Sequence, residues 1–316
     1  MSVDLVTLGE TMGVLAADEI GPLRNGHRMV LGIAGAESNV AIGVSRLGHR
    51  AAWIGRVGAD QVGRLVMREL RGEGVDVECA VTDSAAANGL MLKVHRTTAT
   101  SEVIYARRDS AGSRLSPADV PAELVSSARV LHVTGVTPAL SDTARAAVFR
   151  AIELARSNGV PVSFDVNHRA RLWSDDEATA VFRTLVKQCD IVFASEHEAA
   201  LIVGRCEPAD AATRLTSLGP RHAVIKRGEL GYTAVVDGQP FTAPAVPVPV
   251  ADPVGAGDAF VAGYLASWLA GASPSQALDT ANLVGAFAVA VPGDWEGLPT
   301  REELVAFAHR ADAVTR

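Results

Sequence analysis

Residues 252–263 read Asp-Pro-Val-Gly-Ala-Gly-Asp-Ala-Phe-Val-Ala-Gly. A Pro- and Val-rich stretch over 242–250 precedes them and cannot remain helical for long, whereas 259–270 is apolar on nearly every side, as in a helix buried inside a large domain. We therefore predict that 252–257 is a loop that leads into the N-terminus of a buried helix. Gly255 and Gly257 allow the backbone of this loop to turn sharply or to approach a ligand closely.

The predicted helix start combines an anion site with a carboxylate. First-turn N–H groups have no partner within the helix and carry positive dipole character, so they attract an anion. Asp258 lies in the same turn and would repel a phosphate that was merely bound there. The arrangement makes chemical sense if Asp258 takes a proton from a hydroxyl while the amides hold the charge of a transferred phosphoryl group. An ordinary helix start with an acidic first turn would explain Gly-x-Gly-Asp alone, but not all twelve residues.

The composition restricts the class of protein. The 316 residues are 48% hydrophobic and 21% charged, which is typical of a globular chain with an ample core. The net charge of −7 argues against a nucleic-acid partner. The N-terminus has no basic start or long apolar run, and no segment is long enough to span a membrane. We therefore expect a cytoplasmic protein that binds neither nucleic acid nor membrane.

The cysteines and histidines do not suggest a metal centre. Cys79, Cys189 and Cys206 are far apart and include no Cys-x-x-Cys pair, so we expect reduced and mostly buried thiols. Glu196, His197 and Glu198 could form a ligand group, but exposed helix residues explain them more simply.

Apolar periodicity along the chain predicts an α/β fold. Strands are predicted at 3–8, 51–57, 130–133, 161–166, 191–194, 222–226 and 232–236, and helices at 37–47, 61–71, 142–157, 175–187, 196–203, 208–218, 259–270, 274–291 and 301–309. Repeated strand–helix units imply a parallel-rich central sheet with helices on both faces. No linker separates independent parts, so we expect a single domain over 1–316.

One region departs from this alternation. Over 89–108 the period becomes two, and 97–100 supplies a turn, which predicts a β-hairpin. Together with irregular strands over 10–33, the hairpin would form a small β lid from about 10–34 and 88–109. An exposed strand edge on such a lid invites pairing with a second chain, so we expect a homodimer through the lid.

Three further segments offer groups that could bind a sugar. Gly35 and Asn39 lie at a predicted helix start, where an N-cap cluster would explain them equally well. Tyr105 and Arg107 share one face at the end of the hairpin, and Arg169 follows a predicted parallel strand, where open α/β sheets bind ligands. Two guanidinium groups aimed at one pocket suit an acid sugar better than a neutral one.

These motifs resemble the ribokinase-like (phosphofructokinase-B) sugar kinases. Residues 252–263 are similar to the C-terminal signature of that family, and 35–41 to its N-terminal signature, with Ala34 in place of the first glycine. The resemblance implies that Asp258 is the catalytic base and that the amides of Gly255, Ala256 and Gly257 form the anion hole. Residues 105–113, 164–173 and 293–300 are similar to the 2-keto-3-deoxygluconate kinase branch, in which Gly35, Arg107 and Arg169 would contact the sugar acid.

The resemblance also implies a site for ATP and Mg²⁺. Residues 225–231 look like the nucleotide loop of the family, with Lys226, Gly228 and Gly231 near ATP, and Asn282 falls where the adenine pocket is lined. Glu198 matches the acidic residue near Mg²⁺ and would act through water, although Ser195 replaces the usual Asn. Pro253–Val254 replaces Thr-Thr, so the need for a monovalent cation such as K⁺ stays open.

The best-supported function is therefore ATP-dependent phosphorylation of 2-keto-3-deoxygluconate. Fructokinase or another ketose or ribose kinase is the alternative, since single residues retune substrate choice. A third hypothesis is a catalytically inactive sugar-binding regulator on the same fold. The intact Asp258 argues against it, and a measurement of ATP turnover would decide between a regulator and a kinase. A dehydrogenase would need Gly-x-Gly-x-x-Gly after the first strand, and 3–11 contains no such pattern.

Overall fold

The computed structural model describes residues 3–97 and 100–314. Its centre is an eight-stranded sheet in which six adjacent strands run parallel, and two further strands are added at one edge by antiparallel pairing. In sheet order the strands are β14 (Gln239–Ala243), β13 (Tyr232–Val236), β12 (His222–Lys226), β11 (Ile191–Ser195), β10 (Val162–Asp165), β9 (Val130–Thr134), β1 (Leu5–Leu8) and β4 (Ala51–Ile54). The predicted parallel-rich sheet is confirmed.

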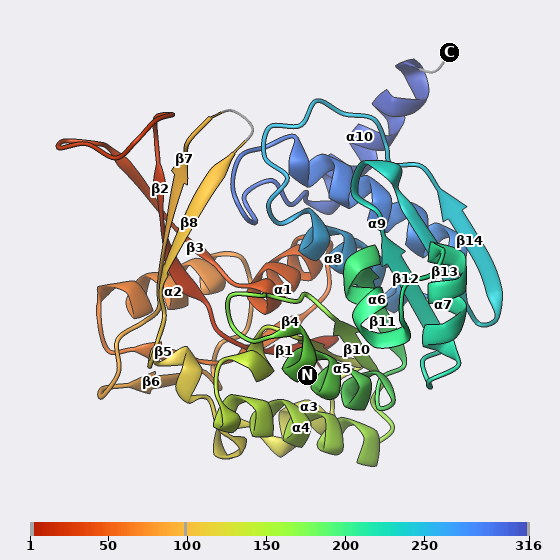
Figure 1. The fold of residues 1–316 in the computed structure, drawn as a ribbon, viewed down its shortest axis with the longest axis horizontal. Coiled ribbons are helices and arrows are strands. Elements are labelled where there is room, and N and C mark those ends of the chain that lie inside the picture. Colours follow the sequence, from red (N-terminus) through yellow and green to blue (C-terminus); the bar gives the residue numbers. More distant parts are fainter. Residues whose placement is uncertain (1–2, 98–99, 315–316) are drawn as a thin grey trace.

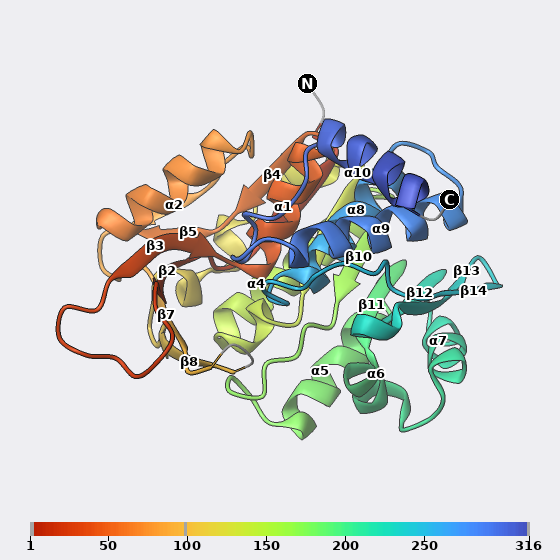
Figure 2. The same ribbon diagram turned by 90° about the horizontal axis from the view of Figure 1, so that it is seen from above.

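Helices cover both faces of this sheet (Figure 2). They are α1 (Ala36–Arg46), α2 (Gln61–Gly72), α3 (Ala122–Ser126), α4 (Asp142–Ser157), α5 (Asp175–Val186), α6 (Glu196–Val203), α7 (Pro208–Thr216), α8 (Ala256–Leu269), α9 (Pro274–Val289) and α10 (Arg301–Val314). One core joins the sheet to α4, α5, α6 and α7, and a second joins it to α1, α2, α8 and α9. Alternate strand residues divide between the two cores, because side chains along a strand point to opposite faces.

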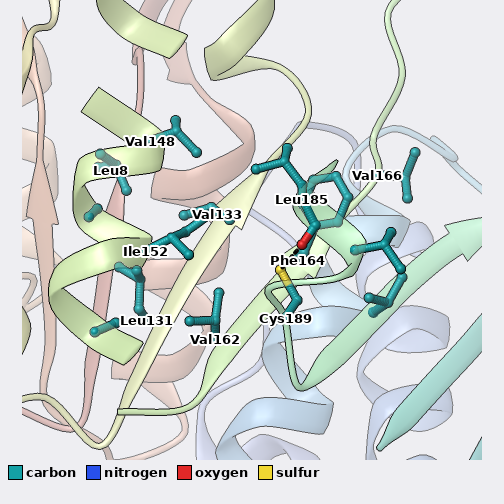
Figure 3. Packing of buried hydrophobic residues seen from close by; sticks show 14 of the residues in the cluster. Leu8, Leu131, Val133, Val148, Ile152, Val162, Phe164, Val166, Leu185 and Cys189 are labelled. Carbon is teal, nitrogen blue, oxygen red and sulfur yellow. Dashed lines mark hydrogen bonds between the residues drawn. The ribbon is translucent and has the colours of Figure 1, made fainter. Parts of the chain in front are cut away.

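The first of these cores is closely packed around β9 and β10. Leu131 and Val133 from β9 meet Val148 and Ile152 from α4, and Phe164 lies beside Leu185 (Figure 3). All of these side chains are fully buried. This packing fixes β10, so the chain that leaves its carboxyl end starts from a rigid position.

A separate four-stranded sheet, called the small sheet below, projects from the body beside α2 (Figure 1). Its order is β3 (Met29–Ala34), β2 (Met12–Ala17), β7 (Leu90–His95) and β8 (Ser101–Ala106). The predicted strands off the main sheet and the predicted hairpin are thus confirmed. Of the turn predicted at 97–100, residues 98–99 lie outside the described residues, and the Thr100 amide donates to Thr97 Oγ1 at 2.9 Å.

Several boundaries differ from the predictions. The strand predicted at 51–57 divides at Gly55, because β5 (Arg56–Gly58) leaves the large sheet to pair with β6 (Val81–Asp83). The edge strand β14 was not predicted, since Pro240 removes a backbone donor and is tolerated only at such an edge. Helix α8 begins three residues earlier than expected, at Ala256, and α10 extends beyond the predicted end at 309 to Val314.

None of the helices in the described part of the chain combines the length and apolar character needed to cross a bilayer. All three cysteines are free thiols. Only Cys189 is buried, so the expectation of mostly buried thiols was wrong for Cys79 and Cys206, which are partly exposed.

Candidate active site

Three parallel strands of the large sheet end, and two helices begin, at one edge of that sheet. Strands β10, β11 and β12 finish at Asp165, Ser195 and Lys226, and the N-termini of α1 and α8 carry Asn39 and Asp258 to the same edge. The carboxyl edge of a parallel sheet is the usual position of a ligand site in this architecture.

Asp258 lies in the first turn of α8 and is 8% exposed. Its Oδ2 accepts a hydrogen bond from Asn39 Nδ2 at 2.8 Å, and its Oδ1 accepts one from Asn167 Nδ2 at 3.3 Å. Asn167 follows β10 with φ +38°, a left-handed conformation that costs a residue other than glycine about 1 kcal/mol or more. Two amides from distant segments therefore hold the carboxylate in one orientation.

Asn39 and Gly35 occupy a more constrained position than their sequence suggests. We predicted that Asn39 could bind sugar hydroxyls, which stays a prediction, and in the structure its amide nitrogen donates to Asp258 Oδ2. Its Oδ1 accepts the Gly35 amide at 3.5 Å. A Cβ atom at Gly35 would lie 2.4 Å from the Glu10 carbonyl oxygen, so any side chain at this position would clash with the backbone of Glu10.

Burial raises the pKa of Asp258 to about 6. The hydrogen bond from Asn39 and the positive charges of Arg169 and Lys226 act in the opposite direction, and the negative charge of Asp294 adds to the increase. A carboxylate with a pKa near 6 is ionised at neutral pH and is still basic enough to accept a proton from a hydroxyl.

The loop before α8 has the geometry expected of an anion site. Gly255 caps the helix with φ +77°, and a Cβ atom there would lie 2.0 Å from the Asp294 carbonyl oxygen. The Ala256 amide donates to the Pro253 carbonyl at 3.4 Å, a long bond. A Cβ atom at Gly257 would lie 3.3 Å from Lys226 Nζ, so the lysine ammonium stands beside the amides of the first turn.

Asp165 and Lys226 form a buried ion pair next to this loop. Lys226 Nζ lies 2.8 and 2.7 Å from the two carboxylate oxygens. Burial raises the pKa of Asp165 to about 6 against the influence of Lys226. For Lys226, burial alone would lower the pKa, but Asp165 and Glu198 outweigh it and the pKa is raised. The sequence reading assigned no role to Asp165, although a carboxylate that ends a buried parallel strand is a recognisable signal.

Glu198 is buried at the start of α6, so the simpler sequence reading of an exposed helix charge was wrong. Its carboxylate accepts the backbone N–H groups of Ser195 at 2.7 Å and of His168 at 2.8 Å. Ser195 caps the same helix in return. Glu196 and His197 are exposed, as expected. No three His, Cys, Asp or Glu side chains gather into a metal site among the residues described.

The predicted nucleotide segments converge near the end of β14. Gly228 has φ +57° with open space around it, and Gly231 has φ +86° against the Ala243 carbonyl oxygen. Asn282 on α9 donates to the Pro244 carbonyl at 2.8 Å. Gly231 and Asn282 thus brace the chain around 243–245, and Gly228 remains free to approach a ligand.

A cleft of about 880 Å³ lies between the end of the small sheet and the loop that follows β10. Tyr105, Arg107 and Arg169 all line this cleft, although Arg107 lies just beyond β8 rather than within it. The Arg107 guanidinium lies over the Tyr105 ring at 5.7 Å. The Arg171 guanidinium binds the Val103 carbonyl and so bridges the two walls.

Two further buried charges were not identified from the sequence. Glu10, directly after β1, lies 2.5 Å from Arg107 Nη2. Lys93 on β7 lies 2.6 Å from Asp252 Oδ2 and 3.9 Å from Asp294 Oδ1. In the sequence Lys93 interrupts an alternating strand on the same face as Met91, and a charge on a buried face is the signal that could have identified it.

The site can accept a proton and stabilise an anion at one end, and bind a carboxylate at the other. Residues 3–301 match the model of the pfkB family of carbohydrate kinases. A 2-dehydro-3-deoxygluconokinase of Bacillus subtilis (strain 168) is 38% identical over 311 residues, covering 97% of this chain and 96% of the relative. A 2-dehydro-3-deoxygluconokinase of Thermoproteus tenax is 37% identical over 305 residues, covering 95% and 93%. A solved structure assigned as ribokinase II from E. coli, in complex with ATP and Mg²⁺, has a TM-score of 0.90 at 26% identity, covering 98% of this chain and 99% of that one.

Proposed function

The chain belongs to the pfkB family of carbohydrate kinases, and we propose that it phosphorylates a sugar acid, 2-keto-3-deoxygluconate (2-dehydro-3-deoxygluconate), with ATP. The observation that carries the substrate class is that Arg107 and Arg169 both line one cleft, which Arg108 and Arg171 line as well. A neutral sugar carries no negative charge that could pair with two guanidinium groups, whereas a carboxylate accepts charge-assisted hydrogen bonds from both. The names of the two relatives point to the same substrate.

In this proposal Asp258 accepts the proton of the attacking hydroxyl. Its burial and its two amide partners support the role, because they leave the carboxylate ionised at neutral pH, oriented and shielded from bulk water. The N-terminus of α8 and Lys226 would hold the negative charge of the transferred phosphoryl group. Preorganised donors of this kind supply most of the catalysis in phosphoryl transfer.

ATP would approach along the segments around Gly228, Gly231 and Asn282. The Glu198 carboxylate suits Mg²⁺, a hard cation that prefers oxygen ligands and retains several waters, so we propose that Glu198 holds it through water. When bound with ATP, Mg²⁺ neutralises charge on the phosphate oxygens. The use of ATP also leads us to propose a cytoplasmic location.

We propose that no monovalent cation is needed. The Asp252 carboxylate, three residues before Gly255, is already paired with the buried ammonium group of Lys93. The Lys93 ammonium group would supply at this position the positive charge that a bound monovalent cation could otherwise provide. Replacement of Na⁺ by K⁺ at constant ionic strength should leave kcat unchanged, and activation of tenfold or more by K⁺ would contradict the proposal.

We also propose that the small sheet acts as the lid of a single-domain enzyme and joins two copies into a homodimer. Strand register aligns Leu31, Leu15, Leu92 and Ile104 in one row across all four strands. Leu31 is 54% exposed and Ile104 is 47% exposed. An apolar row of this kind is a reason for two identical faces to pair about a two-fold axis.

Light scattering at micromolar concentration tests the dimer. The wild type should have twice the mass of the chain, and Leu31→Arg should be monomeric. Val305→Arg on α10 is the matched control, because Val305 is also 54% exposed but lies away from the small sheet, and it should remain dimeric. A monomeric wild type would rule the proposal out.

An assay of ADP release across acid and neutral sugars tests the substrate. We expect kcat/KM to be highest for 2-keto-3-deoxygluconate and at least about tenfold lower for fructose and ribose, since each charge-assisted pair contributes about 1.5–3 kcal/mol. A neutral ketose as the best substrate would overturn the proposed function.

A further inference from the structure

The orientation of the Arg107 guanidinium is already set before a substrate binds, because a buried glutamate holds it. Glu10 Oε2 lies 2.9 Å from Arg107 Nε and 2.5 Å from Nη2. Glu10 therefore occupies the side of the guanidinium that carries Nε. The remaining edge of the guanidinium, formed by Nη1 and the second N–H of Nη2, is not bound by Glu10 and can present two parallel donors to a carboxylate.

The position of Glu10 is fixed by a slot of small residues. Its side chain is 1% exposed, and Ser110 Oγ donates to its Oε1. A Cβ atom at Gly89 would come within 2.6 Å of Oε1, and one at Gly112 within 2.3 Å of the Glu10 Cγ. Neither glycine has the positive φ that would explain it by backbone conformation, so the slot is shaped to the glutamate.

The two ends of the hairpin meet at this slot. Gly89 precedes β7, and Arg107 and Ser110 follow β8, whereas Glu10 belongs to the connection between the large sheet and the small sheet. Glu10 thus joins the body of the molecule to the base of the segment that carries Arg107.

We propose that Glu10 is a positioning residue for substrate recognition: it holds Arg107 from behind and so presents the guanidinium, already ordered, to the substrate carboxylate. The inference rests on the proposed function and adds a residue to it. Arginine has a long side chain with large rotamer freedom, and ordering it only when the substrate binds would weaken binding. A guanidinium preordered by Glu10 avoids that loss.

The charges of the cleft give the two arginines different tasks. The positive charge of Arg107 is neutralised by Glu10, so Arg107 contributes oriented hydrogen-bond donors more than net positive charge. Arg169 is exposed and lies opposite in the same cleft, where it supplies the positive charge that attracts an acid. Specificity for a carboxylate would then depend on both the oriented guanidinium of Arg107 and the exposed positive charge of Arg169.

The test is a double-mutant cycle with Glu10→Gln and Arg107→Ala, measured as kcat/KM on a sugar acid and on a neutral ketose. Gln keeps the volume and an acceptor oxygen but lacks the charge that holds the fork. We expect Glu10→Gln to lower kcat/KM for the acid about tenfold, mainly through KM, and to leave the neutral sugar nearly unchanged. In the Arg107→Ala background Glu10→Gln should have no further effect.

Three results would overturn the proposal. These are an equal loss of kcat/KM on both substrates with Glu10→Gln, the full effect of Glu10→Gln in the absence of Arg107, and a rise in kcat/KM for the acid because the released charge of Arg107 dominates. If Glu10→Gln does not fold, Ser110→Ala replaces it, because it keeps the Glu10 charge and removes the hydrogen bond on Oε1, together with the one that Ser110 Oγ accepts from the Ser113 amide at 3.2 Å. That variant should give a smaller, acid-selective loss of about two- to fivefold, and no acid-selective loss would also overturn the proposal. If the wild type prefers a neutral sugar, the proposed function has failed, and the cycle on that sugar still reports whether Glu10 acts through Arg107.

Discussion

The two ends of the site differ in how the chain builds them. The proposed phosphate end, consisting of Gly255–Asp258 with Asp165 and Lys226 and called the phosphate end below, is centred on one short stretch at the start of α8. The proposed acid end, consisting of Glu10, Arg107 and Arg169 and called the acid end below, takes one residue from each of three segments that are far apart in sequence.

The difference has chemical consequences. At the phosphate end a helix start fixes the amides and the carboxylate together, so every substrate of the enzyme meets the same groups. At the acid end the small sheet and the loop after β10 approach from separate parts of the fold. Changes at the phosphate end should therefore affect all sugars alike, and changes at the acid end should distinguish between them.

The largest effect is expected from Asp258→Asn. Loss of the base should lower kcat by roughly 10²-fold or more, and by the same factor for acid and neutral sugars. Asn keeps the shape of Asp and removes a buried charge, so the fold and ATP binding should remain. Steady-state kinetics with calorimetric ATP titration measures this, and near-normal turnover would remove Asp258 from the mechanism.

A smaller but still severe effect is expected from Gly255→Ala. The new Cβ atom would meet the Asp294 carbonyl at 2.0 Å in a backbone conformation with φ +77°. We expect the free energy of unfolding to fall by at least about 1–3 kcal/mol and activity to fall on every sugar. Gly72→Ala, at the end of α2, is the control, since nothing lies within 4 Å of its Cβ position and φ is not positive. Equal stability of the two variants in urea would contradict the close approach at Gly255.

The acid limb of the pH–activity profile should shift by a modest amount, and in opposite directions, when the charge of Asp294 or that of Arg169 is removed. Asp258 is active when ionised, so kcat/KM should fall as the pH drops through about 6. Asp294→Asn removes a negative charge that raises the pKa of Asp258 and should move this acid limb to lower pH. Arg169→Ala removes a positive charge that lowers it and should move the limb to higher pH.

Stability should change with pH in the opposite sense. Because the folded-state pKa values of Asp165, Asp258 and Asp294 are raised to about 6, the folded protein binds more protons than the unfolded chain between about pH 4 and 6. Stability from these groups is present below pH 4 and is lost as the pH rises through 6. Asp142→Asn, which changes an exposed carboxylate on α4, should leave both profiles unchanged.

The loop and helix start at Gly255–Asp258 could be predicted from sequence because the signals are local: the glycines, Asp258 and the buried helix are consecutive. The alternation of strands and helices likewise predicted the parallel-rich sheet. The ion pairs of Glu10 with Arg107 and of Lys93 with Asp252 could not be predicted, because each joins segments that only the folded small sheet brings together. The same is true of Asn39, whose partner Asp258 lies 219 residues away.

Local patterns also failed at Glu198 and at Gly55. Glu198 has the spacing of an exposed helix residue, but its carboxylate is buried and accepts hydrogen bonds from the backbone amides of Ser195 and His168. The strand predicted through 51–57 divides because the chain changes sheets at Gly55, and apolar periodicity continues across that break.

The most direct test of the sugar-acid assignment is the ratio of kcat/KM for 2-keto-3-deoxygluconate to that for fructose, measured in the wild type and in Arg169→Ala. Arg169 makes no ion pair that its removal would leave unsatisfied among the described residues, so the fold should be preserved. We predict that kcat/KM for the acid falls by roughly ten- to a hundredfold, whereas that for fructose changes little, so the ratio collapses. Equal losses on both sugars would contradict the claim that the two arginines bind a substrate carboxylate.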